Sequence, residues 1–496
     1  MELSCGPPTA TARHTKNDTT VASIVPPLGG AASSLRPAAQ RAAWQLERLV
    51  THTEHSLPRR PAGATEKALL ASMKEVPTTF SQQGSAMIID VCPRSVQQFL
   101  RAWRSQLSDA QFHHLWTIVL ALAVNPGAAK LIHLAATILG GRHRTSLGAF
   151  IRRDNWDEAA LLDDRAQSLV RRLKPRRGEE IQLIIDDTRV LKRGKQMACL
   201  SKIYDYKNKR HGWGHIIILA AIRFRSVTLP WRIVLWRPKA VAGSDYQKFT
   251  EIAAEMIRQM PRFGRLRVRV LFDSFYLCPL VTQACTSRGF SWFSVAQRSR
   301  RFTRTRGRRK AIGELAPGWI RGQGHRVRQR RARRWATLRI AKVCGSLSRI
   351  GHVALVASKR AGDPYKNLVV FATSERRLAA KTIVSIYEQR WAIEILFKEL
   401  RNDLGLCDYQ VLEEDAIVRH LHLCCLSHLM LTHHALDGAG AQARKANHEV
   451  DLPPMSTRLE RLRTEIRRDQ VRRLLKGKKH RRLRMRIEPY FIARAA

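Results

Sequence analysis

Apolar residues along the chain follow two spacings, one typical of strands and one typical of helices. In residues 176–299, short apolar runs alternate with segments in which apolar positions recur every three or four residues. We predict three strands at 181–186, 215–222 and 231–236, and then a helix that is capped by Ser244 and runs through Phe249, Ile252, Met256 and Met260. A strand ending at Asp273, a helix from about Tyr276 and a final strand at 290–295 follow. This is the element order of an RNase H-like α/β core, in which the first and fourth strands end side by side.

Two of the apolar runs end in carboxylates. The first run leads into Asp186 and Asp187, and the fourth strand leads into Asp273. A buried carboxylate is costly to remove from water, so a fold usually keeps one at a strand end for metal or proton chemistry. We therefore expect Asp186 and Asp273, 87 residues apart in sequence, to meet in space.

A helix that could bring a third acid is predicted over 382–405. Tyr387, Arg390, Glu394 and Arg401 follow one another at intervals of three, four and seven residues, so they share one face of this helix. Taken alone, Arg390 and Glu394 would be a surface ion pair worth ~0.3–0.5 kcal/mol. The neighbouring tyrosine and the two acidic strand ends favour a functional site.

The N-terminal part divides by composition. Residues 1–86 are rich in Ala, Pro, Thr and Ser and are predicted to be mostly disordered, unless translation begins at Met73 or Met87. Residues 87–175 are predicted to form a basic helical domain with a capping box at Ser108–Gln111. Both DNA binding and plain helix packing are open roles for this domain.

The remaining segments are basic. Residues 300–365 are predicted to be a strand-rich insertion between the second and third acids, after which the core resumes at 366–436. Residues 437–496 are predicted to be a helical C-terminal region that binds DNA or a partner subunit, with a solvated tail as the alternative. The arginines of the insertion that we assign to DNA contact are Arg304, Arg306, Arg308 and Arg309.

Charge indicates the partner. The chain has 88 Lys and Arg against 40 Asp and Glu, a net charge of +48, and such a chain repels itself unless it meets a polyanion. Because the basic residues are mainly Arg, nucleic acid is favoured over a membrane surface. The nine cysteines form no C-x-x-C pair, which argues against a zinc knuckle or a disulfide framework and indicates a reducing cytosol. Five histidines between 420 and 434 are interpreted as packing residues rather than zinc ligands.

These motifs together resemble a DDE transposase of bacterial insertion sequences, in the cut-and-paste group with the signature Y-x2-R-x3-E-x6-K. The matching residues are Tyr387, Arg390 and Glu394, with Arg401 in place of the lysine. The run Asp273-Ser274-Phe275-Tyr276 resembles the motif of the second acid. The similarity covers about residues 140–436, and it is specific only in combination.

The resemblance implies that Asp186, Asp273 and Glu394 are catalytic and hold two Mg²⁺ ions, which Mn²⁺ can replace. Two metals ~3.5–4 Å apart can activate the attacking oxygen and stabilise the leaving oxygen of a phosphodiester. Asp187 is a further candidate ligand. A D-x-T pattern favours Asp186 as the first acid, and Asp187 stays open as the alternative.

The resemblance also implies that Tyr387, Arg390 and Arg401 contact DNA. The implied function is cleavage and strand transfer at the ends of an insertion sequence, with its terminal inverted repeats and a target DNA as partners. We expect a homodimer on DNA and a location in the bacterial cytoplasm, associated with the nucleoid. A metal-dependent nuclease or resolvase of the same fold, or a catalytically inactive DNA-binding derivative, are the alternatives.

Overall fold

The structure of the protein, a computed structural model, describes residues 92–124, 130–131, 134–135, 143–205, 209–304, 308–331, 334–443 and 452–474. Every described element belongs to one compact unit, residues 79–496. The prediction of disorder for residues 1–86, and Arg306, lie outside the described residues.

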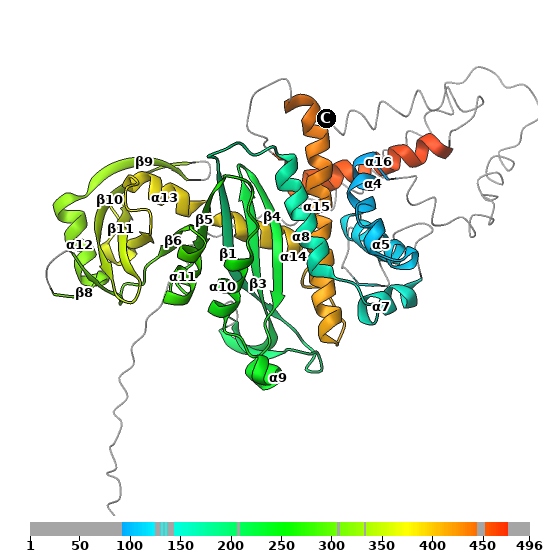
Figure 1. Cartoon of the computed structure of the whole chain (residues 1–496), viewed down its shortest axis with the longest axis horizontal. Helices are drawn as coiled ribbons and strands as arrows, with labels where there is room; N and C mark the ends of the chain where they lie inside the picture. Colours follow the sequence, from blue (N-terminus) through cyan, green and yellow to red (C-terminus); the bar gives the residue numbers. More distant parts are fainter. Residues whose placement is uncertain are drawn as a thin grey trace, which may run out of the picture. The chain divides into compact units, whose positions relative to one another are not determined.

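Strands and helices are mixed along the chain (Figure 1). The strands are β1 (Glu180–Leu191), β2 (Ser201–Asp205), β3 (Arg210–Phe224), β4 (Val227–Leu235), β5 (Arg267–Phe272), β6 (Ser291–Val295), β7 (Arg301–Thr303), β8 (Lys310–Ala311), β9 (His325–Arg331), β10 (Arg334–Leu347), β11 (Gly351–Arg360) and β12 (Val369–Thr373). The helices are α4 (Arg94–Arg101), α5 (Asp109–Val124), α7 (Arg144–Arg152), α8 (Glu158–Arg172), α9 (Lys239–Ala242), α10 (Phe249–Gln259), α11 (Pro279–Ser287), α12 (Ile312–Gln323), α13 (Ala380–Glu388), α14 (Trp391–Asn402), α15 (Glu414–Ala443) and α16 (Met455–Leu474).

The strands form one 12-stranded mixed sheet, in the order β2-β3-β1-β5-β6-β12-β11-β10-β7-β8, with β4 paired to β3 and β9 paired to β10. The predicted order of three strands, helix, strand, helix and strand is confirmed by β1, β3, β4, α10, β5, α11 and β6, and β2 is an additional strand. β1 is antiparallel to β3 and parallel to β5. This mixed α/β arrangement is consistent with an RNase H-like core.

Two details of the predicted core are corrected. Ser244 does not cap α10, because it lies in a short 3-10 turn, η3 (Gly243–Asp245), several residues before the helix. The N–H of Lys248 at the start of α10 donates instead to the Glu251 carboxylate, at 2.7 Å. The helix after β5 begins at Pro279, so Tyr276 lies in the loop that leads into it.

The basic segment 300–365 is strand-rich as predicted, and α12 is an unpredicted helix within it. Its strands extend the core sheet, because β12 pairs with β6 on one side and with β11 on the other. β11 lies within this segment, and β12 follows it at the start of the resumed core.

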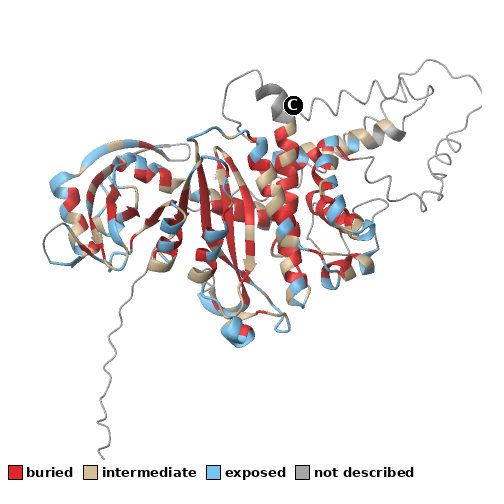
Figure 2. Ribbon diagram, viewed as in Figure 1, coloured by how far each residue is buried: buried red, intermediate tan, exposed pale blue. Residues whose placement is uncertain are grey.

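The N-terminal helices share their core with the C-terminal part of the chain. α4, α5, α7 and α8 pack against α15, which is buried along most of its described length (Figure 2). The predicted capping box at the start of α5 is confirmed: the Gln111 N–H donates to Ser108 Oγ at 3.3 Å, and the Ser108 N–H donates to Gln111 Oε1 at 3.1 Å. None of the described helices has a stretch both long and apolar enough to cross a membrane.

Candidate active site

Asp186 lies within β1 and not at its end, which corrects the sequence-based expectation. The parallel pairing of β1 with β5 stops at the pair Ile185–Phe272, whereas β3 stays paired with β1 as far as Leu191. β5 itself ends at Phe272, so Asp273 does follow its strand. Asp186 and Asp273 are each the next residue after the last β1–β5 pair, and the backbone places them side by side.

The single helix predicted over 382–405 is wrong. α13 and α14 are separated by a turn at Gln389 and Arg390. In this turn the Arg390 N–H bonds to the Tyr387 carbonyl at 2.9 Å and the Ile393 N–H bonds to the Arg390 carbonyl at 3.1 Å, a tighter spacing than that of an α-helix. The turn carries Arg390 toward β1.

Arg390 joins the first and third predicted acids. Its Nη1 donates to Asp186 Oδ2, and its Nη2 donates to Glu394 Oε1 at 3.3 Å. The side chains of Arg390 and Asp186 are only 16% and 13% exposed, so their ion pair is largely buried. The Glu394 side chain is 38% exposed, so its pair with Arg390 is partly open to solvent. Asp186 and Glu394 thus share one guanidinium although 208 residues separate them in sequence.

Negative charge is concentrated around this guanidinium. Burial raises the pKa of Asp186 to about 7; Arg390 opposes this shift, while Glu394, Asp273 and Asp187 add to it. Neighbouring charges shift a pKa strongly when they lie within about 4–6 Å. The four carboxylates therefore form one electrostatic cluster.

Asp187 has a different partner from Asp186. Successive side chains of a strand point to opposite faces, and Tyr276 Oη donates to Asp187 Oδ1 at 3.1 Å. Burial raises the pKa of Asp187; the bond from Tyr276 opposes the shift and Asp273 adds to it. Asp273 also orders its own loop, because its Oδ1 accepts the Phe275 N–H at 2.8 Å. Asp186 and Asp187 both adjoin Asp273. Of these two, Asp186 is the one that shares Arg390 with Glu394.

Tyr387 lies beside the same cluster. Its ring is 5.2 Å from the Phe371 ring, and the Arg390 guanidinium carbon is 6.0 Å from its centre. Burial raises the pKa of Tyr387 to about 12, Arg390 opposes this shift, and Asp273 and Asp186 add to it. The Tyr387 hydroxyl consequently keeps its proton near neutral pH and can donate it in a hydrogen bond.

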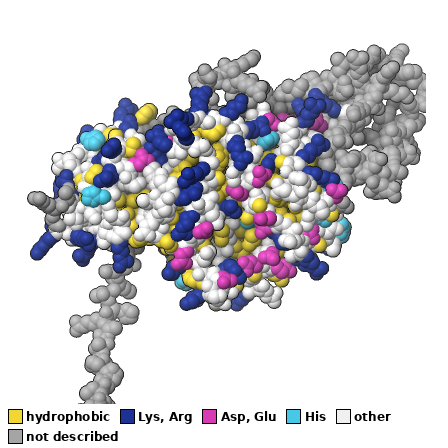
Figure 3. Space-filling view, viewed as in Figure 1, with side chains coloured by type: hydrophobic (Ala, Val, Ile, Leu, Met, Phe, Trp, Pro, Cys, Tyr) yellow, Lys and Arg dark blue, Asp and Glu magenta, His cyan; other side chains and the backbone are white. Residues whose placement is uncertain are grey.

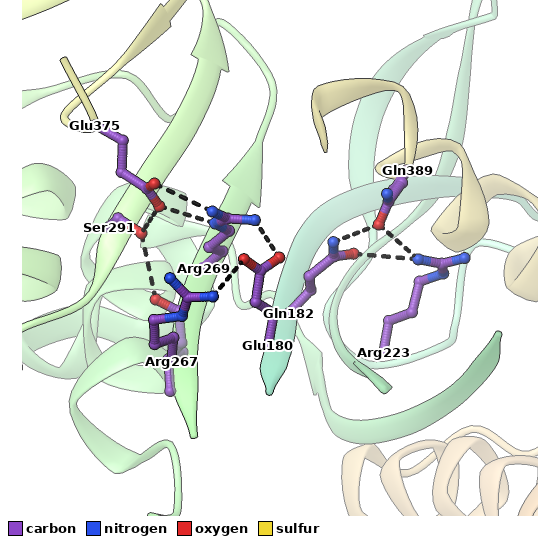
Figure 4. Close-up of polar contacts among 9 residues, drawn as sticks. Glu180, Gln182, Arg223, Arg267, Arg269, Ser291, Glu375 and Gln389 are labelled. Carbon is purple, nitrogen blue, oxygen red and sulfur yellow. Dashed lines mark hydrogen bonds and ion pairs between the residues drawn. The ribbon is translucent and has the colours of Figure 1, made fainter. Parts of the chain in front are cut away.

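A polar network that the sequence did not reveal holds the turn between α13 and α14 on the sheet (Figure 4). Gln182 Nε2 donates to Gln389 Oε1, and Arg223 Nη1 donates to the same oxygen at 2.7 Å. The available signal was Gln182 itself, a polar residue inside the first apolar run and four positions before Asp186, hence on the same face of β1.

A second unpredicted cluster lies under the start of β5 (Figure 4). Arg269 is 6% exposed and pairs with Glu180 of β1 and, at 2.8 Å, with Glu375 just after β12. Glu375 also accepts a bond from the Ser291 hydroxyl at 2.6 Å. These contacts join β1, β5, β6 and β12 at a polar point of the sheet.

The other predicted site residues are placed apart from the cluster. Arg401 lies on α14 with its guanidinium carbon 5.8 Å from the centre of the Phe397 ring, and no polar contact between described residues joins it to the acids. Arg304, Arg308 and Arg309 are exposed. Figure 3 shows Lys and Arg side chains spread across the whole face drawn, as the net charge implies.

Four of the five histidines on α15 are buried, and each has a partner. Two histidines contact backbone carbonyls: His420 Nε2 lies 3.0 Å from that of Gly405, and His422 Nδ1 lies 2.8 Å from that of Val418. The other three contact side chains. His428 Nε2 lies 2.9 Å from Glu399 Oε2, His434 Nδ1 lies 2.8 Å from Ser95 Oγ, and His433 contacts Arg172. The His422 contact stays within α15, and the other four tie α15 to neighbouring segments. Both kinds of contact agree with the packing interpretation.

Metal binding would require some movement of the cluster. Within the described ranges, no three His, Cys, Asp or Glu side chains are placed so that they could hold a metal ion together. The guanidinium of Arg390 lies between Asp186 and Glu394. The four carboxylates of the cluster supply the oxygen donors that a hard divalent cation prefers. Burial raises the pKa of two of them, Asp186 and Asp187, and repulsion from the neighbouring carboxylates adds to this shift.

Comparison with known proteins points to a class. Residues 104–349 match the family model of the DDE superfamily endonuclease. This stretch contains Asp186, Asp187 and Asp273 but ends before α13 and α14, so Arg390 and Glu394 lie outside it.

The chain is also similar to a probable transposase for insertion sequence element IS701 from Microchaete diplosiphon. The two are 24% identical over 183 residues, 36% of this chain and 47% of the relative, so the match spans about half the length of that protein. Both similarities support a DDE-type transposase.

Proposed function

We propose that the protein is a DNA transposase that cleaves and joins DNA at the ends of an insertion sequence. The observation that carries the proposal is the sharing of Arg390 by Asp186 and Glu394 next to Asp273. A protein that only binds DNA has no evident use for several carboxylates that repel one another around a buried aspartate, whereas a phosphodiester-cleaving site does.

The carboxylates of this cluster are the proposed metal ligands. Asp186, Asp273 and Glu394 would hold Mg²⁺ or Mn²⁺, with Asp187 as a further oxygen donor. When bound, two such ions activate the attacking oxygen and stabilise the leaving oxygen of an in-line displacement. A cation would also relieve the repulsion from Glu394, Asp273 and Asp187, which adds to the effect of burial on the pKa of Asp186.

Arg390 and Tyr387 are the proposed phosphate contacts. Once Asp186 and Glu394 are neutralised by a cation, the Arg390 guanidinium is free to bind a phosphate through paired N–H groups. The Tyr387 hydroxyl, which keeps its proton, can donate to the same DNA strand. Arg304, Arg306, Arg308 and Arg309 would add backbone contacts outside the site.

The proposal is tested by cleavage of the element's own ends. Inverted repeats would be located in the DNA that flanks the gene, and labelled end duplexes incubated with the full chain and Mg²⁺. Glu394→Gln should keep end binding and lose cleavage, because it removes a charge and little else. Glu255→Gln is the matched control, since Glu255 is exposed on α10 and pairs there with Arg258.

The products distinguish the alternatives. Cleaved ends that become joined to a second duplex support a transposase. Cleavage without joining would indicate a nuclease or resolvase, and end binding by the natural chain without any cleavage would indicate an inactive derivative.

A further inference from the structure

A cavity lined by arginines lies at the edge of the core away from the acids. Its volume is about 350 Å³, near the lower end of the range for ligand pockets, roughly 300–1,000 Å³. Five of its nine lining residues are arginines and none is acidic: Arg171, Arg176, Arg177, Arg262 and Arg265. The whole chain has 88 Lys and Arg in 496 residues, so nine positions taken at random would hold one or two basic residues.

The cavity is separate from the carboxylate cluster. Arg176 and Arg177 precede β1, and Arg262 and Arg265 precede β5. The two strands are parallel, and the acids lie where their pairing stops, so the cavity is at the opposite end of both strands. Six residues separate Glu180 from Asp186, about 20 Å at ~3.3 Å per residue.

Backbone and side-chain contacts fix the two loops that form the cavity. The Gly178 N–H donates to the Arg265 carbonyl at 3.3 Å, which joins the loops directly. Glu179 accepts the Arg176 N–H at 2.6 Å and pairs with Arg225 at 3.0 Å. These contacts hold the two loops together around the cavity.

The guanidinium groups of the cavity are available. All five arginines are exposed, and no ion pair among the described residues involves any of them. Arg171 bonds to a neutral partner, Gln167 Oε1, at 2.9 Å. Glu179 adjoins Arg176, but its carboxylate already pairs with Arg225. Five like charges held close together repel one another, so an anion would stabilise this arrangement.

We infer that this cavity binds backbone phosphates of a second DNA segment, distinct from the DNA end at the acids. The identity of the polyanion as DNA rests on the proposed function. Guanidinium groups match phosphate oxygens as paired donors. The aromatic ring in the lining, Phe263, is only 8% exposed and cannot stack on a base, which favours a sugar-phosphate backbone over a free nucleotide. Such contacts position DNA without reading its sequence.

Arginine footprinting of the full chain tests the inference. The protein would be treated with phenylglyoxal alone and with each of three probes: a 20-base-pair duplex of arbitrary sequence, inorganic pyrophosphate and poly-glutamate. Peptide mass spectrometry then reports each arginine separately. The duplex should slow modification of Arg176, Arg177, Arg262 and Arg265 at least fivefold, more than either other probe does.

Each outcome has a defined meaning. Protection by pyrophosphate alone overturns the assignment to DNA, and equal protection by poly-glutamate indicates an acidic protein partner instead. If the duplex protects Arg304, Arg308 and Arg309 but not the cavity, the inference fails and the proposed function stands. If it protects neither group, the proposed function fails as well.

A variant pair provides a second measurement. Changing Arg176, Arg177, Arg262 and Arg265 to Ala should flatten the salt dependence of duplex binding by up to ~3–4 units, at about 0.9 per phosphate contact. Changing the same four residues to Lys keeps the charge and should retain most of the slope. Equal slopes in the Ala variant and the natural chain would exclude the cavity from DNA binding.

Discussion

Gln182 on β1 donates its side-chain amide to Gln389, the residue directly before Arg390 in the turn between α13 and α14. Gln182 and Asp186 lie on the same face of β1, so the two neighbouring turn residues bind two points of one strand. Arg223 supports the contact from β3. The position of Arg390 over the carboxylates thus depends on a network outside the cluster.

We predict that Gln389→Leu lowers the rate of DNA cleavage, by roughly 10- to 100-fold, because small displacements of positioned groups are costly in rate. Affinity for the DNA ends should change less. Single-turnover cleavage and end binding would be measured on the same preparations, with Gln259→Leu, an exposed substitution on α10, as the control. An unchanged cleavage rate would show that the network has no positioning role.

Arg390→Ala should destabilise the metal-free protein. Removing one partner of a buried ion pair leaves an uncompensated charge, a loss of about 3–5 kcal/mol for full burial and less here because both groups are partly exposed. Mg²⁺ should raise the Tm of the variant more than that of the natural chain, since the cation replaces the lost counter-charge. An equal rise in Tm for both proteins would contradict competition between Arg390 and the metal.

The sequence predicted the core well because strand periodicity and acidic strand ends are local signals. Asp273 follows its strand as expected. Asp186 does not lie at a strand end, because β1 continues to Leu191 in its pairing with β3. The break at Gln389 was also missed. Both turn residues keep helical backbone angles, so helical spacing continues through the turn and hides it.

The contacts that support the carboxylate cluster from outside could not be predicted from the sequence. Nothing near Arg223 or Gln389 indicates that they meet, because their pairing follows from how α13 and α14 cross the sheet. The arginine cavity was also missed, since its two halves come from loops about 85 residues apart. Residue type and spacing indicated the chemistry of the carboxylate cluster but not the side-chain contacts that position it.

Acid should destabilise the fold through the histidines of α15. Burial lowers the pKa values of His420 and His422 to about 4, below the ordinary value near 6.5. The unfolded chain therefore binds these protons more tightly, so the stabilisation is complete above pH 6.5 and is lost as pH falls toward 4. The expected loss at pH 5.5 is roughly 1 kcal/mol per histidine.

Urea unfolding at pH 7.5 and 5.5 checks this prediction. His422→Gln should be less stable than the natural chain at pH 7.5 and should lose less stability between the two pH values. The same pH-dependent loss in the variant and the natural chain would assign the acid sensitivity to other groups.

The basic segment between β7 and β8 should contribute sequence-independent affinity. Replacing Arg304, Arg306, Arg308 and Arg309 with Ala should flatten the salt dependence of DNA binding by up to ~3–4 units and weaken binding to all sequences alike. Preference for the element ends should survive. A variant that keeps the salt slope but loses discrimination between natural and scrambled ends would make this segment the sequence reader.

The most direct test of the carboxylate site is anomalous diffraction from the full chain crystallised with Mn²⁺ and an end duplex. We predict Mn²⁺ peaks within ligand distance, about 2.0–2.3 Å, of carboxylate oxygens of Asp186, Asp273 and Glu394, with the Arg390 guanidinium moved from between Asp186 and Glu394 to a DNA phosphate. Peaks that omit Glu394 or Asp273, or an Arg390 still bridging the two acids beside bound metal, would contradict the proposed site.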